Sequence, residues 1–409
     1  MNAAVEFDCV IVGGGLVGAS LACALGGEGL RLAVLEAAPD SVPAPPSYDD
    51  RGLALSPSSQ RVLQGLGLWE QLRAESTPIR QIHVTERGRF AFTRLQAAEL
   101  GVEALGYVVV ARVLGAVLLG RLGQLANVQF LRPAKPSRIK LHRNRIDVSI
   151  TQGLHGVRTL SARLLIAADG GDSQTRTLLG IESRTHDYRQ TAVVATVFPE
   201  RPHHGTAYER FTPSGPLALL PMTEQRCVAV WTVRSEQAQA LLHLDDSAYQ
   251  QGLLEHSGGY LGGFQRAGGR RAYPLHLIQA QRIVGPRAAL VGNAAHTLHP
   301  NAAQGLNLGL RDVATLAELV VDAFRQGADM GDPQLLKKYA DLRGDDQKRV
   351  LRLSDGLAQI FYNELWPAIL LRDAAMLAVD LLPPLKSALA RRAMGLAGRQ
   401  PRLACGLPL

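Results

Sequence analysis

The sequence predicts a mixed α/β (α+β) fold with an inserted β-sheet domain and C-terminal helices. Three observations support this: a glycine-rich turn after an apolar N-terminal run, period-2 alternation in the middle of the chain, and helical periodicity near its end. The glycine-rich turn makes the first domain Rossmann-like. With 409 residues, 46% of them hydrophobic, the chain is long enough for two or three domains with large cores.

The N-terminal segment has the pattern of a dinucleotide-binding turn. Residues 7–12 (FDCVIV) form an apolar run typical of a buried parallel strand. Glycines in the spacing GxGxxG follow, at Gly13, Gly15 and Gly18. A helix is expected over 19–25 and a strand over 32–35, and Glu36 lies 18 residues beyond the last glycine. Such glycines admit a pyrophosphate to a helix N-terminus and such an acid accepts from a ribose, so the pattern predicts FAD or NAD(P) binding.

Two later segments repeat the pattern of a buried strand that ends in a turn of small residues. The first, LLIAADG, contains Asp169, and Ser173 is expected to cap the helix that follows. The second, AALVGN, ends in Gly292 and Asn293, and a long helix is expected from Gln304 to about residue 324. Taken singly, the first segment is as consistent with an ordinary strand-to-helix turn as with a binding site.

Together these segments resemble the class A flavoprotein aromatic hydroxylases, which have a glycine-rich ADP site, a DG segment and a GD segment in this order. The resemblance extends from residue 5 to about residue 345. It narrows to the ubiquinone-biosynthesis hydroxylases, and among them to the 2-octaprenyl-6-methoxyphenol hydroxylase branch, through 83–88 (HVTERG), 209–222 (ERFTPSGPLALLPM) and 272–275 (AYPL). Asn293 stands where most of class A has Asp; an amide oxygen still accepts a ribityl hydrogen bond, and the Asn form resembles the same branch.

The resemblance implies bound FAD and NAD(P)H as a transient co-substrate, since the chain has one dinucleotide fingerprint for two nucleotides. The residues that it implies for FAD binding are Gly13, Gly15, Gly18, Glu36, Arg51, Arg112, Asp169, Gly292, Asn293, Gly305 and Asn307. For Arg51 the alternative is a surface ion pair with Asp49 or Asp50. For Arg112 the alternative is a surface charge at a helix start.

The loop that includes 299–305 is expected to pass beside the isoalloxazine ring. It supplies the candidate catalytic residues His299, Pro300 and Gln304, with no dedicated acid or base among them. His296 and His299 have an i,i+3 spacing, but no third ligand is nearby, so packing or flavin orientation is expected in place of a metal site. The candidates for the substrate side, each with core packing as its alternative, are Tyr208, Phe211 and Tyr273.

The reaction that the resemblance implies is hydroxylation of an electron-rich ring. NAD(P)H reduces FAD, the reduced flavin reacts with O₂, and the terminal oxygen of the C4a-hydroperoxide attacks a phenol carbon. The implied substrate is a polyprenylated phenol, 2-polyprenyl-6-methoxyphenol, hydroxylated para to its hydroxyl to give the 1,4-benzoquinol. The alternatives are a sister hydroxylase acting at another ring position, and a non-catalytic subunit that binds FAD or prenyl lipid.

The motifs and periodicities predict three regions. An FAD-binding domain is expected over 1–75, 100–180 and 270–325, a substrate-binding β-sheet domain over 76–99 and 181–269, and a helical region over 326–409. Strands are expected in the second region at 191–198 and 226–233. The helices of the third region should be interrupted at Pro367 and at Pro383-Pro384.

The net charge of +8 is concentrated near the end of the chain. No acid follows Asp380, whereas five bases do: Lys386, Arg391, Arg392, Arg399 and Arg402. A basic, apolar tail suits an anionic membrane surface or a partner protein of ubiquinone biosynthesis, with a solvated tail as the alternative. No nucleic-acid motif accompanies the charge, so nucleic acid is not expected. Without a signal peptide or an apolar run of about 18 residues, the chain is expected in the cytoplasm or on the inner face of the cytoplasmic membrane.

Overall fold

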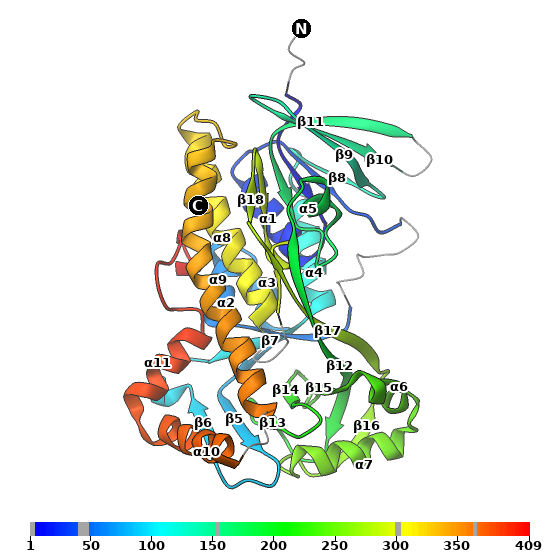
Figure 1. Cartoon of the computed structure of the whole chain (residues 1–409), viewed down its shortest axis with the longest axis vertical. Coiled ribbons are helices and arrows are strands. Elements are labelled where there is room, and N and C mark those ends of the chain that lie inside the picture. Colours follow the sequence, from blue (N-terminus) through cyan, green and yellow to red (C-terminus); the bar gives the residue numbers. More distant parts are fainter. Residues whose placement is uncertain (1–4, 40–48, 153–155, 299–303, 363–365) are drawn as a thin grey trace.

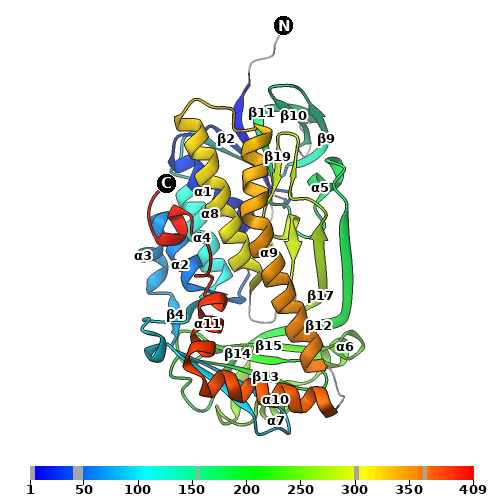
Figure 2. The ribbon, with the colours of Figure 1, turned by 60° about the vertical axis from the view of Figure 1, so that its left-hand side comes forward.

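The computed structural model describes residues 5–39, 49–152, 156–298, 304–362 and 366–409 (Figure 1). Two large sheets follow one another along the long axis of the molecule, and long helices run down one side of both (Figure 1, Figure 2). The predicted mixed α/β architecture is confirmed. The four cysteines are free.

The first sheet is built on the predicted N-terminal strand, β1 (Phe7–Val12), which pairs in parallel with β2 (Leu32–Leu35) and β11 (Val157–Ala167). The strand order is β18-β19-β11-β1-β2-β8, with β10 and β9 added antiparallel beside β11. Because the carboxyl ends of its parallel strands meet at one edge, the turns that follow them come together there. The remaining strands are β8 (Val128–Leu131), β9 (Lys135–Leu141), β10 (Ile146–Thr151), β18 (Val284–Gly285) and β19 (Ala288–Leu290).

Side chains alternate along each strand of this sheet, so its two faces pack against different layers. Cys9 and Ile11 face a core shared with three helices, whereas Val10 and Val12 face the β9–β10 hairpin. The three helices are α1 (Leu16–Gly27), α4 (Ala111–Leu122) and α8 (Gln304–Arg325). The long helix predicted from Gln304 is therefore confirmed, and it lies against the glycine-rich helix α1.

The second sheet has the order β20-β17-β12-β15-β14-β13-β5-β6, with β16 on β12. The strands predicted at 191–198 and 226–233 are confirmed as parts of β12 and β15. Val193, Ala229 and Trp231 face a core closed by α6 (Ser235–His243) and α7 (Asp246–Ser257). The strands are β5 (Gln81–Glu86), β6 (Phe92–Gln96), β12 (Ser183–Pro199), β13 (Thr206–Phe211), β14 (Leu217–Pro221), β15 (Cys227–Arg234), β16 (Phe264–Ala267), β17 (Arg271–Ala280) and β20 (His296–Thr297).

A third, smaller sheet has the order β3-β7-β4, formed by β3 (Gly52–Leu55), β7 (Gly106–Val110) and β4 (Ser76–Ile79). Helices α2 (Pro57–Gly65) and α3 (Trp69–Arg73) follow β3. Ser56 caps α2, because its hydroxyl accepts from the Ser59 N–H at 3.3 Å.

The C-terminal helices begin and end close to the predicted prolines. They are α9 (Pro333–Tyr362), α10 (Trp366–Leu381) and α11 (Pro383–Ala393). Pro367 lies in the first turn of α10 and Pro383 opens α11, positions at which the missing N–H of proline costs no helical hydrogen bond. No helix in the described ranges is long and apolar enough to cross a membrane.

The basic tail is more ordered than the sequence suggests. Arg402 donates its backbone N–H to Glu318 at 2.6 Å and pairs with Asp322, and Lys386 lies 3.1 Å from Glu99. Leu403 is buried against the core of the first sheet. The charges of Lys386 and Arg402 are therefore neutralised within the protein, and the contact of the tail with a membrane surface or a partner stays a prediction.

Candidate active site

A cavity of about 1080 Å³ lies between the glycine-rich turn of the first sheet and one face of the second sheet. This volume is at the upper limit of the roughly 300–1,000 Å³ usual for one small ligand. We call its two parts the glycine end, lined by Gly13, Gly15, Leu16 and Glu36, and the sheet floor, lined by Val84, Val194, Glu209, Phe211, Ala218 and Val230.

The glycine end has no room for side chains on the turn itself. A Cβ on Gly13, which has φ +107°, would lie 2.3 Å from the Ala168 carbonyl oxygen, and one on Gly18 would lie 1.9 Å from the Gly13 carbonyl oxygen. Gly15 is the N-cap of α1, and its carbonyl accepts from the Ala19 N–H at 2.8 Å. The first turn of α1 contains no acid, so the positive end of the helix is open to a phosphate group in the cavity.

Glu36 is buried and held by the backbone. One carboxylate oxygen accepts from the Gly14 N–H at 2.9 Å and the other from the Ala38 N–H at 2.8 Å. Each oxygen can accept a further hydrogen bond from a group in the cavity, which Glu36 lines. The geometry therefore suits a ribose acceptor beside a phosphate site, the pair predicted from sequence.

Both predicted arginines form ion pairs, and for Arg51 the pair is the alternative considered from the sequence. Arg51 lines the cavity, but its Nε lies 2.7 Å from Asp49, and its guanidinium lies 4.6 Å from the centre of the Tyr273 ring. The Tyr273 hydroxyl donates to the same Asp49 at 2.9 Å, and burial raises the pKa of Tyr273. Arg112 is exposed, pairs with Asp50 at 2.9 Å and does not line the cavity.

The Asp169 carboxylate lines the cavity while it organises the following helix, α5 (Gln174–Leu178). It accepts from the Ser173 hydroxyl and, at 2.9 Å, from the Thr175 N–H. Ser173 in turn caps α5 as predicted, since its hydroxyl accepts from the Arg176 N–H at 2.9 Å. Asp169 thus fixes the shape of the turn at the cavity wall.

The segment after β19 reaches the cavity through Asn293, whose side chain is exposed there. Gly292 has φ +57° and does not line the cavity. At the start of α8, the Asn307 side chain accepts from the Ser56 N–H at 2.7 Å and donates to the Ala54 carbonyl at 2.9 Å. Asn307 therefore joins α8 to the end of β3 in addition to lining the cavity.

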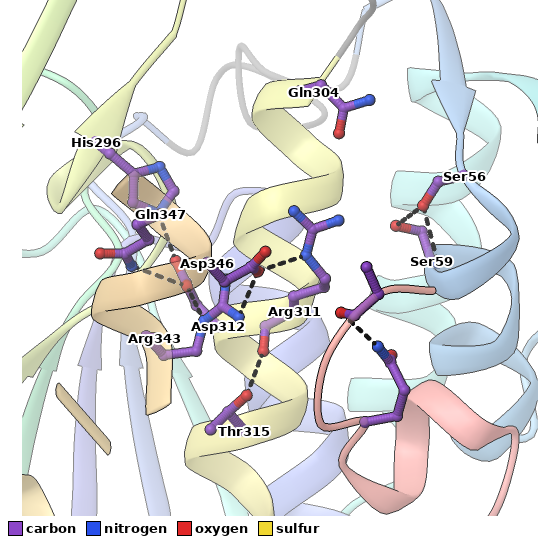
Figure 3. A network of polar contacts seen from close by, with 12 residues as sticks. Ser56, Ser59, His296, Gln304, Arg311, Asp312, Thr315, Arg343, Asp346 and Gln347 are labelled. Carbon is purple, nitrogen blue, oxygen red and sulfur yellow. Dashed lines mark hydrogen bonds and ion pairs between the residues drawn. The ribbon is translucent and has the colours of Figure 1, made fainter. Parts of the chain in front are cut away.

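A buried polar network, which the sequence analysis did not predict, supports the Gly292–His296 segment (Figure 3). Asp312 on α8 accepts from the Gly292 N–H at 3.0 Å, from His296 Nε2 at 2.7 Å, from Arg343 Nε at 2.7 Å and from Gln347 at 3.1 Å. Burial opposes ionisation of Asp312, but the charges of His296 and Arg343 outweigh it and hold the pKa of Asp312 well below its usual range. The sequence signal was an acid within an otherwise apolar helix face.

The network extends from α8 to α9. Arg311 and Arg343 both contact Asp346, at 2.9 and 2.7 Å, and these two charges lower the pKa of Asp346 in spite of its burial. In Figure 3, His296, Arg343 and Gln347 lie on one side of α8 and Ser56 lies on the other, with the Arg311 side chain between them. His296 is therefore a packed residue at the edge of the site, as expected.

Only two of the three predicted substrate residues lie at the cavity. Phe211 and Tyr273 line the cavity, but Tyr208 does not. Tyr208 lies one position from Glu209 on β13 and so points to the other face, where it stacks on Tyr260 with ring centres 5.4 Å apart. Tyr208 was expected on the substrate side, but because alternate residues of β13 point to opposite faces of the sheet, it lies on the face away from the cavity.

The candidate catalytic residues His299 and Pro300 lie outside the described residues. Gln304 opens α8, lines the cavity and donates from its amide to the Ala393 carbonyl of α11 at 3.2 Å. Gly305 also lines the cavity, and a Cβ there would meet nothing within 4 Å. No group of three or more His, Cys, Asp or Glu side chains in the described ranges could hold a metal ion.

The family model with the description FAD binding domain matches residues 6–354. The chain is 42% identical to the ubiquinone hydroxylase UbiL of Rhodospirillum rubrum, over 98% of this chain and 93% of that protein. It is 33% identical to the 3-demethoxyubiquinol 3-hydroxylase of Escherichia coli, over 95% of this chain and 98% of that protein.

The solved structures confirm the fold. The p-nitrophenol 4-monooxygenase PnpA of Pseudomonas putida superposes with a TM-score of 0.79 at 19% identity, covering 97% of this chain and 99% of that chain. A dinucleotide-binding fold requires a close glycine turn, a helix whose first turn has no acid, and an acid held for the ribose. Here these are the turn from Gly13 to Gly18, helix α1 and Glu36.

Proposed function

The chain belongs to the FAD binding domain family and is an FAD-dependent, NAD(P)H-using aromatic monooxygenase related to the ubiquinone-biosynthesis hydroxylases; on this premise we propose that it hydroxylates the ring of a polyprenylated phenol. The observation that carries the proposal is the composite cavity. It joins a dinucleotide-type glycine end to a long apolar sheet floor in one space.

The glycine end fits FAD. Gly13 and Gly15 line the cavity and would admit the pyrophosphate at the start of α1, Gly18 would keep α1 close to the Gly13 carbonyl, and Glu36 would accept from a ribose hydroxyl. Asn293 and the start of α8 at Gln304 would lie along the remainder of the cofactor. When bound, FAD supplies hydride acceptance and oxygen activation.

The protein's own contribution is to bind, orient and exclude water. The apolar residues of the sheet floor, with Leu389 and Met394 of the C-terminal segment, favour an isoprenoid chain because burying each methylene contributes about 0.8 kcal/mol. The same apolar wall keeps water from the reacting ring. The polar side chains of Glu209 and Tyr273 line the floor side of the cavity and would orient a phenol.

The substrate that we propose first is 2-polyprenyl-6-methoxyphenol, hydroxylated para to its hydroxyl, on the strength of the motif resemblance. A second candidate is the same chemistry at another ring position. The match to the 3-demethoxyubiquinol 3-hydroxylase of E. coli, which covers nearly the whole length of that protein, supports it. The two differ in the substituents that the ring already carries and in which ring carbon faces the flavin.

Profiling of quinone intermediates in a deletion strain tests the proposal. Accumulation of the polyprenyl methoxyphenol supports the first candidate, and accumulation of a more substituted quinol supports the second. The purified protein should be yellow, and the accumulated compound should stimulate its NAD(P)H oxidation. An unchanged quinone profile together with no stimulation would refute the proposed substrate class.

A further inference from the structure

Half of the exposed large hydrophobic side chains that the structure describes lie within 20 consecutive residues. On α10, Trp366 and Leu371 are 72% and 73% exposed. We call this surface the α10 ridge; it is formed by Trp366, Leu370, Leu371, Leu381, Leu382 and Leu385. Such a concentration of exposed apolar side chains in one segment indicates an interaction site.

Helix α10 has the reverse of the usual polarity. Its charged residues face the protein: Arg372 pairs with Glu86, and Asp380 accepts from the Arg94 N–H at 2.8 Å. Its outward positions follow the spacing i, i+4, i+8 and carry Trp366, Leu370 and Ala374. The helix lies at the lower end of the molecule in both views (Figure 1, Figure 2).

The helices that carry the ridge also form the wall of the cavity. Ala375, Met376 and Val379 of α10 and Leu389 and Ala393 of α11 line its apolar part. A single layer of helix therefore separates the ridge from the cavity. This connects the outer apolar surface with the space assigned above to an isoprenoid chain, so the inference rests on the proposed function.

Basic residues flank the ridge. On α11, Ala388 and Arg392 lie three and seven positions beyond Leu385, on the same helix face. Within the described ranges Arg391 and Arg392 make no ion pair, unlike Lys386. At the other end, Glu86 and Arg372 bring the β5–β6 turn to α10, and this turn carries Arg89 beside Phe90, which is 77% exposed.

We propose that the α10 ridge docks on an anionic lipid bilayer, from which the polyprenylated substrate passes into the cavity beside α10 and α11. Leucines and one tryptophan with basic residues at the margin match the interfacial zone of such a bilayer. At 16 residues α10 is about 24 Å long, which suits a helix lying in the interface. The occupant is lipid, because basic residues flank the apolar ridge and the same helices line the space assigned to an isoprenoid chain.

Tryptophan fluorescence of the FAD-loaded protein tests the contact directly. Of the three tryptophans, Trp69 and Trp231 are buried and Trp366 is exposed. Vesicles of phosphatidylcholine and phosphatidylglycerol should shift the emission to the blue, and brominated acyl chains should quench it. Trp366→Phe should remove both effects. An unchanged emission, or the same shift in the variant, would overturn the proposal.

Vesicle flotation measures the strength of docking. Leu370→Gln with Leu371→Gln should weaken binding by roughly tenfold or more. The matched control is Leu141→Gln with Val157→Gln, two exposed positions on the first sheet, which should bind as wild type. Arg391→Gln with Arg392→Gln should weaken binding to anionic vesicles by about fivefold per arginine and leave binding to pure phosphatidylcholine unchanged. Flavin absorbance checks that each variant is folded.

The remaining outcomes separate docking from the proposed function. The ridge variant should keep turnover of a short-chain, water-soluble phenol and lose turnover of a long-chain phenol supplied in vesicles. Vesicle binding without any phenol oxidation would refute the proposed function and support docking. Docking would be overturned if the wild-type protein does not bind vesicles but self-associates, and if the ridge variant loses that self-association. The ridge would then be a protein interface.

Discussion

At the glycine end of the cavity, a single added methyl group at Gly18 would lie 1.9 Å from a backbone oxygen, whereas the sheet floor consists of side chains that stand side by side on a regular sheet. Glu209, Ala218 and Val230 lie directly opposite one another on β13, β14 and β15. The glycine end is shaped by backbone, and the floor by exchangeable side chains.

The difference indicates how each part selects its ligand. Backbone that is crowded to within van der Waals contact accepts one ligand shape and loses it when any residue grows. A floor of apolar side chains changes its shape by a methyl group at a time without altering the sheet. We therefore expect the cofactor to be invariant among relatives of this fold and the ring substituents to vary.

The largest effect is expected at Gly18. Gly18→Ala forces its Cβ into the Gly13 carbonyl, so α1 cannot keep its place on β1, at a cost of about 3 kcal/mol or more. The variant should be purified without FAD and should unfold at a lower temperature. Gly120→Ala in α4 is the control, because a Cβ there meets nothing within 4 Å, and it should match or exceed wild type. A yellow, stable Gly18→Ala protein would contradict a backbone-defined glycine end.

The next effect concerns the buried Asp312 network, which supports the Gly292–His296 segment. Asp312→Asn leaves the Arg343 charge in a buried site with less compensation, and should cost about 3 kcal/mol of unfolding free energy. Because the pKa of Asp312 is lowered in the folded state, wild type keeps this contribution above a pH of about 3.9 and loses it as the pH falls further.

Urea unfolding at several pH values checks this. The variant should be less stable near neutral pH and should lose less stability on acidification than wild type. Asp341→Asn, an exposed partner of Lys337, should change neither quantity measurably. Parallel pH profiles for Asp312→Asn and wild type would show that Asp312 is not ionised in the fold.

A smaller effect is expected at the exposed Asn293. Asn293→Asp keeps an acceptor oxygen and should retain the flavin, whereas Asn293→Leu removes the acceptor and should bind the flavin more weakly. A hydrogen bond contributes about 1 kcal/mol, so the loss should appear as incomplete flavin occupancy on purification. The ratio of flavin to protein absorbance measures it, and full occupancy in the Leu variant would exclude Asn293 from the FAD site.

The smallest effect on the fold is expected on the sheet floor. Ala218→Leu adds volume inside the cavity, so FAD content and melting temperature should stay unchanged while KM for a long-chain substrate rises several-fold. The same change at Ala229, which faces the α6–α7 core on the neighbouring strand, should destabilise the protein by about 1–3 kcal/mol. Equal destabilisation by both would remove the distinction between floor and core.

The glycine turn, Glu36 and the cap at Ser173 could be predicted because each belongs to a pattern contained in one short stretch of the chain. Other features depend on long-range contacts. Tyr208 was placed on the wrong face, since both faces of the second sheet are covered and alternation does not say which face meets the cavity.

Charged residues were harder to assign for a similar reason. Arg51 binds its neighbour Asp49, an outcome that the sequence offered only as an alternative. The partnership of Asp312 with Arg343 joins two helices, and neither helix pattern contains it. The tail bases could not be known to meet Glu318 and Asp322, because those acids lie about 80 residues earlier.

The Asn307 side chain is bonded to the backbone of residues 54 and 56, about 250 positions earlier, and Gln304 is bonded to Ala393. On the ribosome, where chains emerge from the N-terminus, the glycine turn appears first and its opposing wall last. A nascent chain therefore exposes half of a nucleotide site throughout most of its synthesis. We therefore expect the cofactor to be captured only after α8 and α11 have been synthesised.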